Sequence, residues 1–252
     1  MPFTFSHPAI VLPFIALRQR WRSATGLIIG SMAPDFEKFL RMSLHDPYSH
    51  TWRSIFYFNL PVGILACFLF HLVVRNALID HLPYFLRQRF YRFKQFNWTA
   101  HFKKHYGVVL FSLLVGVVSH LGWDSFTHKE GLGVRLFPFL QQDVLPEPFR
   151  RPLFALLQQI LSVLGGMVMV GFIYLLPKDE RVPARKNILG YWIMAAVIVC
   201  LVMTWWLLAG GKLNRYYLII AAISAGLLSL ILLPLVLKAK ELFSRNSMNR
   251  PL

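Results

Sequence analysis

The chain contains very little cysteine for its length. Only 2 of its 252 residues are cysteines, Cys67 and Cys200, and both lie inside apolar runs. These two residues are typical of core-filling side chains, and they indicate neither a disulfide framework nor a thiolate metal site. The N-terminus also lacks a basic region before its first apolar stretch, which Pro13 interrupts. We therefore expect no cleavable signal peptide.

Acidic residues are scarce as well, with 11 Asp and Glu against 27 Lys and Arg and a formal net charge of +16. Such a charge can mark a nucleic-acid-binding protein. Here, however, the basic residues gather in short segments between apolar runs, and no basic stripe with interleaved aromatics stands apart from those runs. This pattern excludes nucleic-acid binding as the main function and is typical of the loops of membrane proteins.

Hydrophobic residues are abundant, at 56% of the chain, and the mean hydropathy is +0.50. The composition predicts an all-α, polytopic membrane protein in contact with lipid. About five transmembrane helices are expected, at residues 55–79, 107–123, 153–176, 188–209 and 216–237. We expect residues 1–152 to form a region with two spans and a candidate site, and residues 153–252 to form a three-span region.

The first 54 residues contain only short apolar pieces, at 9–17 and 24–33. A crossing needs about 20 residues, so these pieces predict short helices that lie at the interface or pack against the bundle. Residues 30–37 have Pro34 early and two acids next to it, which predicts a turn into a new helix.

The most informative stretch closes the second expected span and reads SHLGWDSFTH, residues 119–128. His120, Asp124 and His128 are spaced four apart, so on a continuous helix they lie on one face. Imidazole and carboxylate groups are ligands for zinc, manganese and iron. Ionisable groups at the end of a membrane helix are costly to place there, so the stretch favours a metal site. A structural hydrogen-bonded pair, with His128 as an ordinary loop residue, remains the alternative.

Topology selects the residues that can join this stretch. With five spans, residues 1–54 and 124–152 share a membrane face in either orientation. The basic loop 80–106 favours the cytoplasm for the other face, whereas the basic cluster 18–22 favours the opposite orientation, so orientation stays open. The candidates on the shared face are His7, Asp35, His45, Asp46 and His50. His81, His101 and His105 fall on the other face, and His71 lies deep in its span.

Most of these candidates also have a structural interpretation. Asp35 could simply complement a helix dipole from the first turn. His7 could be an ordinary residue before a helix that begins at Pro8. His45 and Asp46 are interpreted as loop residues.

Five segments resemble a bacterial membrane family, domain of unknown function 4184: MPFTFSHPA, GSMAPDFEKFL, YSHT, NLPVG and SHLGWDSFTH. Most of the chain matches, and the first 130 residues match most specifically. The motif order is similar to that of membrane-bound metal-dependent hydrolases, which have an early His, a Pro-Asp step, a Thr-His-Ser-like step and His-x-x-x-Asp. It is distantly similar to zinc-dependent phospholipase C, an all-helical fold.

The resemblance implies six metal ligands and a multi-pass protein of the bacterial inner membrane. The ligands are His7, Asp35, His50, His120, Asp124 and His128. Asp35 and Asp124 are the expected catalytic carboxylates. Unlike the phospholipase, this chain has no His-x-x-x-Glu step, which favours one or two metal ions, with Zn²⁺ expected first and Mn²⁺ or Fe²⁺ as alternatives.

The function expected from these features is metal-dependent hydrolysis of a phosphoester or lipid-linked substrate. A different class is a non-enzymatic membrane scaffold or an ion-binding transporter component, which the three C-terminal spans favour. A third interpretation is a purely structural metal that pins the N-terminal segment to the bundle.

Overall fold

The computed structural model describes residues 3–183 and 187–248, and the described residues form helices without strands. Parts of the opening motif, of the basic loop before residue 188 and of the C-terminal tail lie outside the described residues. The N-terminal helices are η1 (Thr4–Ser6), α1 (Pro8–Ile15), η2 (Gln19–Trp21), α2 (Ala24–Gly30), η3 (Ala33–Asp35) and α3 (Phe36–Arg41). The middle of the chain forms η4 (Ile55–Asn59), α4 (Leu60–Leu69), η5 (Phe70–Val74), α5 (Arg75–His81), α6 (Tyr84–Phe90) and η6 (Tyr91–Gln95). The remaining helices are α7 (Trp98–Thr127), α8 (Leu132–Leu136), η7 (Pro138–Gln141), α9 (Leu153–Leu175), α10 (Ile188–Leu208) and α11 (Arg215–Met248).

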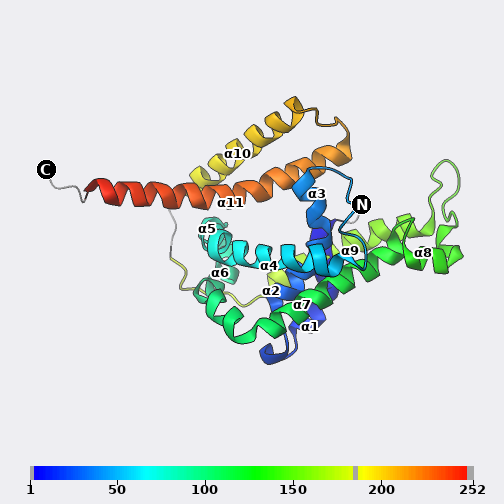
Figure 1. The fold of residues 1–252 in the computed structure, drawn as a ribbon, viewed down its shortest axis with the longest axis horizontal. Coiled ribbons are helices and arrows are strands. Elements are labelled where there is room, and N and C mark those ends of the chain that lie inside the picture. Colours follow the sequence, from blue (N-terminus) through cyan, green and yellow to red (C-terminus); the bar gives the residue numbers. More distant parts are fainter. Residues whose placement is uncertain (1–2, 184–186, 249–252) are drawn as a thin grey trace. The chain divides into compact units, whose positions relative to one another are not determined.

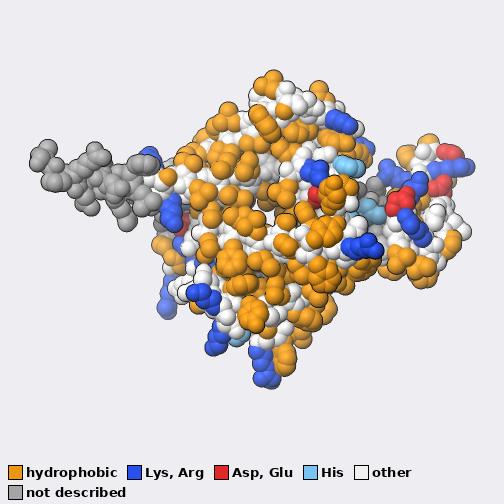
Figure 2. All heavy atoms as spheres, in the orientation of Figure 1, with side chains coloured by type: hydrophobic (Ala, Val, Ile, Leu, Met, Phe, Trp, Pro, Cys, Tyr) orange, Lys and Arg blue, Asp and Glu red, His pale blue; other side chains and the backbone are white. Residues whose placement is uncertain are grey.

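Five helices in the described part of the chain are long and apolar enough to cross a membrane, which confirms the predicted architecture. They span Ile55–His81, Trp98–Thr127, Leu153–Leu175, Ile188–Leu208 and Arg215–Lys240. In the apolar windows of α9 and α10, only 6% and 11% of residues are buried inside the protein. Hydrophobic side chains predominate on the visible surface (Figure 2). Contact with lipid accounts for these exposed apolar surfaces, because their exposure to water would be energetically unfavourable.

The first span contains two wide, π-helical turns, η4 and η5. Pro61 lies two residues after the last residue of η4, and it has no backbone N–H to donate to the carbonyl four residues earlier. The N–H of Leu60 bonds to the carbonyl of Ile55, five residues back. The helix is therefore widened locally before Pro61, and the span continues to His81.

The second span is longer than predicted. Hydropathy placed its start at residue 107, but α7 begins at Trp98 and has 30 residues. The polar turn before Gly107 lowers the hydropathy without ending the helix, and the chain only departs from helical geometry at His105 (φ −131°, ψ 29°). His101 and His105 therefore lie on α7, with ring centroids 5.1 Å apart, and not in a loop.

The chain divides into two compact units, each described by itself. The first comprises residues 1–37, 46–67 and 99–176, and it contains every candidate ligand. Its apolar core joins Ala33, Ile55, Val117 and Leu121. Figure 1 shows α7 as one long, bent helix in this unit.

Within the first unit, α2 and α7 cross with their backbones in close approach. A Cβ built on Gly30 would lie 2.3 Å from the carbonyl oxygen of Leu113, and one on Gly116 would lie 2.5 Å from that of Leu27. Gly26 meets Ser112 in the same way, at 2.9 Å between the built Cβ and the serine Cβ. Each helix thus contributes a pair of small residues four apart, the pattern that lets membrane helices pack tightly.

Helix α9 contains three glycines, at 165, 166 and 171, and one of them lies in a close packing contact. A Cβ on Gly165 would lie 2.9 Å from the Cβ of Ser6, so this glycine lets η1 lie against α9. A Cβ on Gly166 or Gly171 would meet nothing within 4 Å. The contact at Gly165 fixes the segment that leads into His7.

The second unit comprises residues 38–45, 68–98 and 177–252. Here α10 and α11 form a helical hairpin (Figure 1), with Tyr191, Ala195 and Leu233 in its core. The ring of His81 stacks on Tyr191 at 4.0 Å between centroids. Arg75 is buried in the first span. Its guanidinium donates hydrogen bonds to the carbonyls of Phe96 (2.7 Å) and Lys94 (3.1 Å), so the buried charge has hydrogen-bond partners inside the protein.

Candidate metal centre

His120 and Asp124 are adjacent on one face of α7, as their spacing predicts. The ring of His120 is fully buried, and its Nδ1 lies 2.7 Å from the carbonyl oxygen of Ser31, at the end of α2. That bond places the proton on Nδ1 and directs Nε2 towards Asp124, 3.3 Å from Oδ2. The close crossing of α2 and α7 therefore orients this imidazole.

His7 is brought to the same place from the N-terminus. It lies between η1 and α1, where Pro8 begins the helix with its fixed φ angle. The buried ring stacks on His120 with centroids 3.9 Å apart. Its Nε2 lies 3.8 Å from Oδ1 of Asp124. Two histidines separated by more than 110 residues thus face one carboxylate.

Asp35 reaches the cluster from the short helix η3, which confirms the expected turn around Pro34. The carboxylate is buried, and Thr4 donates its hydroxyl to Oδ2 at 2.6 Å. The other oxygen, Oδ1, lies 3.5 Å from Nε2 of His50. Asp35 is therefore held at one oxygen and faces the histidines with the other.

His50 approaches from the loop before the first span. Its Nδ1 lies 2.7 Å from Oδ2 of Asp46, and its Nε2 lies 3.6 Å from Oδ2 of Asp124. Glu37 supports this loop, because its Oε2 accepts the backbone N–H groups of Tyr48 (3.0 Å) and Ser49 (2.7 Å). A carboxylate on Nδ1 of a histidine is the usual way in which proteins orient Nε2 towards a metal.

The ligand atoms form two overlapping groups that share His120. Each group offers one atom per residue, all within 4.8 Å of one another, and the groups are His7, Asp35, His120 and His50, His120, Asp124. Both oxygens of Asp124 and Nε2 of His120 are buried and form no hydrogen bond with a described residue. A buried carboxylate without hydrogen bonds is costly, and a bound cation would offset that cost. The donor set therefore fits a divalent metal.

His128 lies beyond these groups. It follows the last residue of α7, and the chain turns at Gly131, where an added Cβ would lie 2.3 Å from the carbonyl oxygen of Ser125. Its Nδ1 is 3.5 Å from Oδ1 of Asp124, while its Nε2 is 3.2 Å from Nε2 of Gln158. The side chain is 35% exposed, so His128 lies at the open edge of the cluster.

Several residues that shape the cluster were missed or underrated from the sequence. Asp46 is in a loop, as expected, yet it holds His50; the four-residue spacing of this pair was a usable signal. The pair Gly26 and Gly30, also four apart, indicates the close crossing. By contrast, no local pattern indicates that Glu37 caps the loop before His50. His45 is exposed, as expected of a loop residue.

The helices and the cluster together define an all-helical, multi-pass membrane protein with His and Asp groups that could bind a metal ion. The chain belongs to the family described as Domain of unknown function (DUF4184), whose model matches residues 1–237. That range contains all six expected ligands, four of the five candidate spans, and the fifth span up to residue 237. No curated protein and no solved structure shows a significant match to the chain. The family resemblance is thus confirmed, whereas the likeness to hydrolases stays a prediction.

Proposed function

We propose that this protein is a membrane-embedded, metal-dependent hydrolase of phosphoester or lipid-linked substrates. The observation that carries the proposal is the environment of Asp124. Four imidazoles lie within 3.3 to 3.8 Å of its two oxygens, yet neither oxygen accepts a hydrogen bond from a described residue. Converging nitrogen and carboxylate donors without cysteine suit Zn²⁺, Mn²⁺ or Fe²⁺.

The residues of the two groups would hold the metal, with His120 and Asp124 at the centre. A bound metal ion would acidify water in the site and polarise a phosphoryl oxygen. His50 and His120 present their Nε2 atoms because Asp46 and the Ser31 carbonyl occupy the Nδ1 atoms. The protein thus fixes the orientation of both imidazoles in advance, which reduces the cost of assembling the site.

Asp35 is the candidate general base when its Oδ1 is not itself bound to the metal. Thr4 occupies Oδ2, so Oδ1 is the atom that would accept a proton from an attacking water. Its distance of 3.5 Å from Nε2 of His50 places that oxygen at the edge of the ligand atoms. The side chain of His50 is 20% exposed, so water and substrate can approach from this side.

The substrate class is inferred from the position of the cluster along α7. Asp124 lies three residues before the end of the helix, and this end of a membrane span lies at the level of the lipid headgroups. A phosphoester in a headgroup, or one linked to a lipid carrier, can reach that level without leaving the membrane. This is the support for a lipid or lipid-linked phosphoester over a wholly soluble substrate.

Metal removal tests the enzymatic proposal. The purified protein should hydrolyse at least one member of a panel of phosphodiesters, phosphomonoesters and phospholipids. A chelator should abolish turnover, and Zn²⁺, Mn²⁺ or Fe²⁺ should restore it, as measured by released phosphate or headgroup. Metal retained without turnover across the panel would contradict the hydrolase and favour an ion-binding scaffold or transporter component.

Replacing Asp46 by alanine should weaken metal binding by roughly 10- to 100-fold without unfolding the protein. The reason is that Nδ1 of His50 loses its carboxylate partner and keeps only the weaker hydrogen bond to the hydroxyl of Ser49, 3.0 Å away, so the ring can rotate Nε2 away from the cluster. Titration with a metal-competing dye measures the affinity. Glu130→Ala is the matched control, since this exposed acid pairs with Arg135 and is not one of the residues that hold the cluster. Equal affinity in both variants would show that Asp46 does not orient the ligand.

A further inference from the structure

A second chemically distinctive surface lies in the other unit, on the segment between the first two spans. Helices α6 and η6 together cover residues 84–95 and contain four basic residues and no acid. Three of them are used internally: Lys94 forms an ion pair with Asp80, Arg89 donates to the carbonyl of Phe85 at 2.7 Å, and Arg87 donates to the carbonyl of Asp80 at 3.3 Å. Arg87 and Arg92 form no ion pair with any described residue. The segment therefore keeps uncompensated positive charge.

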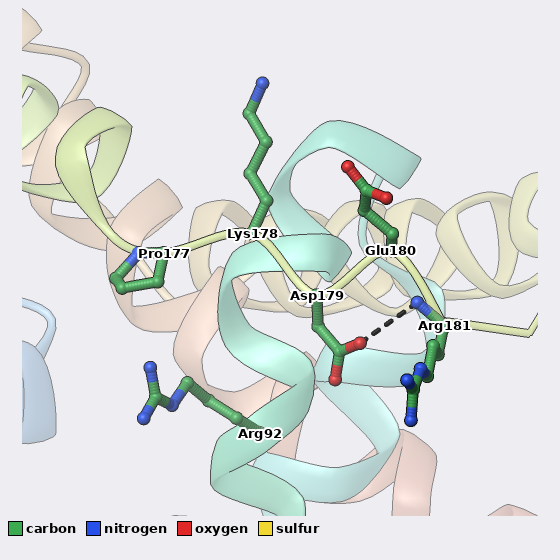
Figure 3. Close-up of a pocket in the computed structure, with 6 residues that line it drawn as sticks. All are labelled: Arg92, Pro177, Lys178, Asp179, Glu180 and Arg181. Carbon is green, nitrogen blue, oxygen red and sulfur yellow. Dashed lines mark hydrogen bonds between the residues drawn. The ribbon is translucent and has the colours of Figure 1, made fainter.

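The segment after α9 packs on this basic helix. The backbone N–H of Asp179 donates to the carbonyl of Gln88 at 2.9 Å, which ties residues 177–181 to α6. Between the two lies a cavity of about 360 Å³. Figure 3 shows its lining: Arg92 from η6, and Pro177, Lys178, Asp179, Glu180 and Arg181 from the following segment.

The charges around the cavity favour an anion. Three of the six lining residues are cations, Arg92, Lys178 and Arg181, and none of them forms an ion pair among residues 3–183 and 187–248. The two acids offset part of this charge. However, one carboxylate oxygen of Asp179 already accepts a hydrogen bond from the backbone N–H of Arg181 at 3.0 Å (Figure 3). This bond stabilises part of the negative charge of Asp179 within the protein. Buried Arg87 adds a further positive charge in the same helix.

The residues that line this cavity are close in sequence to the ends of two candidate membrane spans. Lys178 is three residues after the end of α9 at Leu175, so its Cα is at most about 11 Å from that end. Arg92 is six residues before α7 begins at Trp98. Tyr84, Phe85 and Phe93 on the basic segment are exposed. Exposed aromatic rings among Arg and Lys residues at span ends are typical of the lipid interface.

We propose that this cavity binds the phosphate of an anionic phospholipid headgroup. The cavity is large enough for a glycerol phosphodiester, and basic pockets beside membrane helices recognise such headgroups. The aromatic rings would lie among the headgroups. The side chains of Arg92, Lys178 and Arg181 extend in different directions (Figure 3), and these long, exposed side chains would turn towards the phosphate when it binds. This lipid site is separate from the His/Asp cluster and requires neither metal nor hydrolysis.

The test compares lipid retention by the wild type and by Arg92→Gln/Lys178→Gln/Arg181→Gln. Both proteins are exchanged into mixed micelles with equal phosphatidylglycerol and phosphatidylcholine, and native mass spectrometry counts the bound lipid. The wild type should retain phosphatidylglycerol selectively. The variant should bind it more weakly by about fivefold per basic residue removed, because each contributes on the order of 1 kcal/mol at a membrane surface.

The matched control is Arg135→Gln/Arg150→Gln/Arg151→Gln, which removes the same charge from exposed positions in α8 and in the loop before α9. It should retain phosphatidylglycerol like the wild type. An equal loss in both variants, or unselective binding by the wild type, would overturn the site. Displacement of the lipid by millimolar inorganic phosphate at constant ionic strength would assign the cavity to a soluble anion and overturn the lipid assignment. This experiment measures bound lipid and neither metal content nor turnover. A negative result would therefore not contradict the hydrolase proposal.

Discussion

Replacing Asp124 by asparagine should lower metal affinity on the order of 100-fold or more, the largest effect expected of any single substitution in the cluster. Asp124 faces four histidines, and Asn has nearly the same shape but no charge. Metal per protein after purification, measured by elemental mass spectrometry, should fall to background. Asp143→Asn, in an exposed loop, should retain the metal content of the wild type.

The thermal stability of the same variant distinguishes a metal site from a structural ion pair. A saturating metal should stabilise the wild type, by about 2.7 kcal/mol at 100 times the dissociation constant, and should not stabilise the variant. In the metal-free state the variant should be at least as stable as the wild type, because it no longer buries a carboxylate without hydrogen bonds. A metal-free variant that is markedly less stable would show instead that Asp124 is a structural partner of the histidines.

Hydropathy predicted the number of spans because each apolar run is long enough to identify alone. It misplaced the start of α7 because Lys103, Lys104 and His105 lower the local average, while helical hydrogen bonding continues through polar residues. The hydropathy pattern also did not predict the wide turn before Pro61. Its cause is a missing N–H, but the choice between a kink and a wider turn depends on which carbonyl the neighbouring N–H reaches.

The candidate site was predictable to the extent that it depends on spacing and topology. The pair His120 and Asp124 follows from helix geometry, and the shared membrane face selects the N-terminal residues as its partners. Neither argument predicts which of those residues would contribute most to metal binding. The supporting role of Glu37 depends on the path of the loop around Ser49, and a single sequence does not specify that path.

The stacked pair of His7 and His120 depends on tertiary packing in the same way. It requires η1 to lie against α9 at Gly165 and α2 to lie against α7. Small residues make such contacts possible, but their positions in the sequence do not predict which helices pack together. Of three glycines in α9, only Gly165 packs closely. The pattern therefore indicates that close packing occurs, and only the fold shows where.

The crossing of α2 and α7 can be tested by placing the same substitution at two positions of one helix. Gly116→Ala should destabilise the protein by about 3 kcal/mol, at the upper end of the cost of overpacking. The new Cβ would lie 2.5 Å from the carbonyl oxygen of Leu27 and 2.6 Å from the nitrogen of Ser31. Both atoms belong to the backbone, so no side-chain rotation can relieve the clash and α2 must move away.

Gly122→Ala is the matched control, six residues along the same helix. A Cβ there would meet nothing within 4 Å, and alanine in a helix is favoured over glycine by about 1 kcal/mol. This variant should therefore be as stable as the wild type or slightly more stable. Thermal unfolding in detergent, followed by circular dichroism, measures both. If the two variants unfold at the same temperature, the close crossing is wrong.

Metal affinity in Gly116→Ala then tests whether the crossing also prepares the site. The three atoms nearest to a Cβ on Gly116 belong to Leu27, Gly30 and Ser31 and not to a candidate ligand, but a displaced α2 removes the Ser31 carbonyl from Nδ1 of His120. Measured below its unfolding temperature, the folded variant should bind metal more weakly by roughly 10- to 100-fold, since the imidazole loses the partner that orients it. Unchanged affinity in a destabilised but folded variant would separate the two roles. It would mean that the crossing holds the fold while His120 is oriented by its stacking on His7.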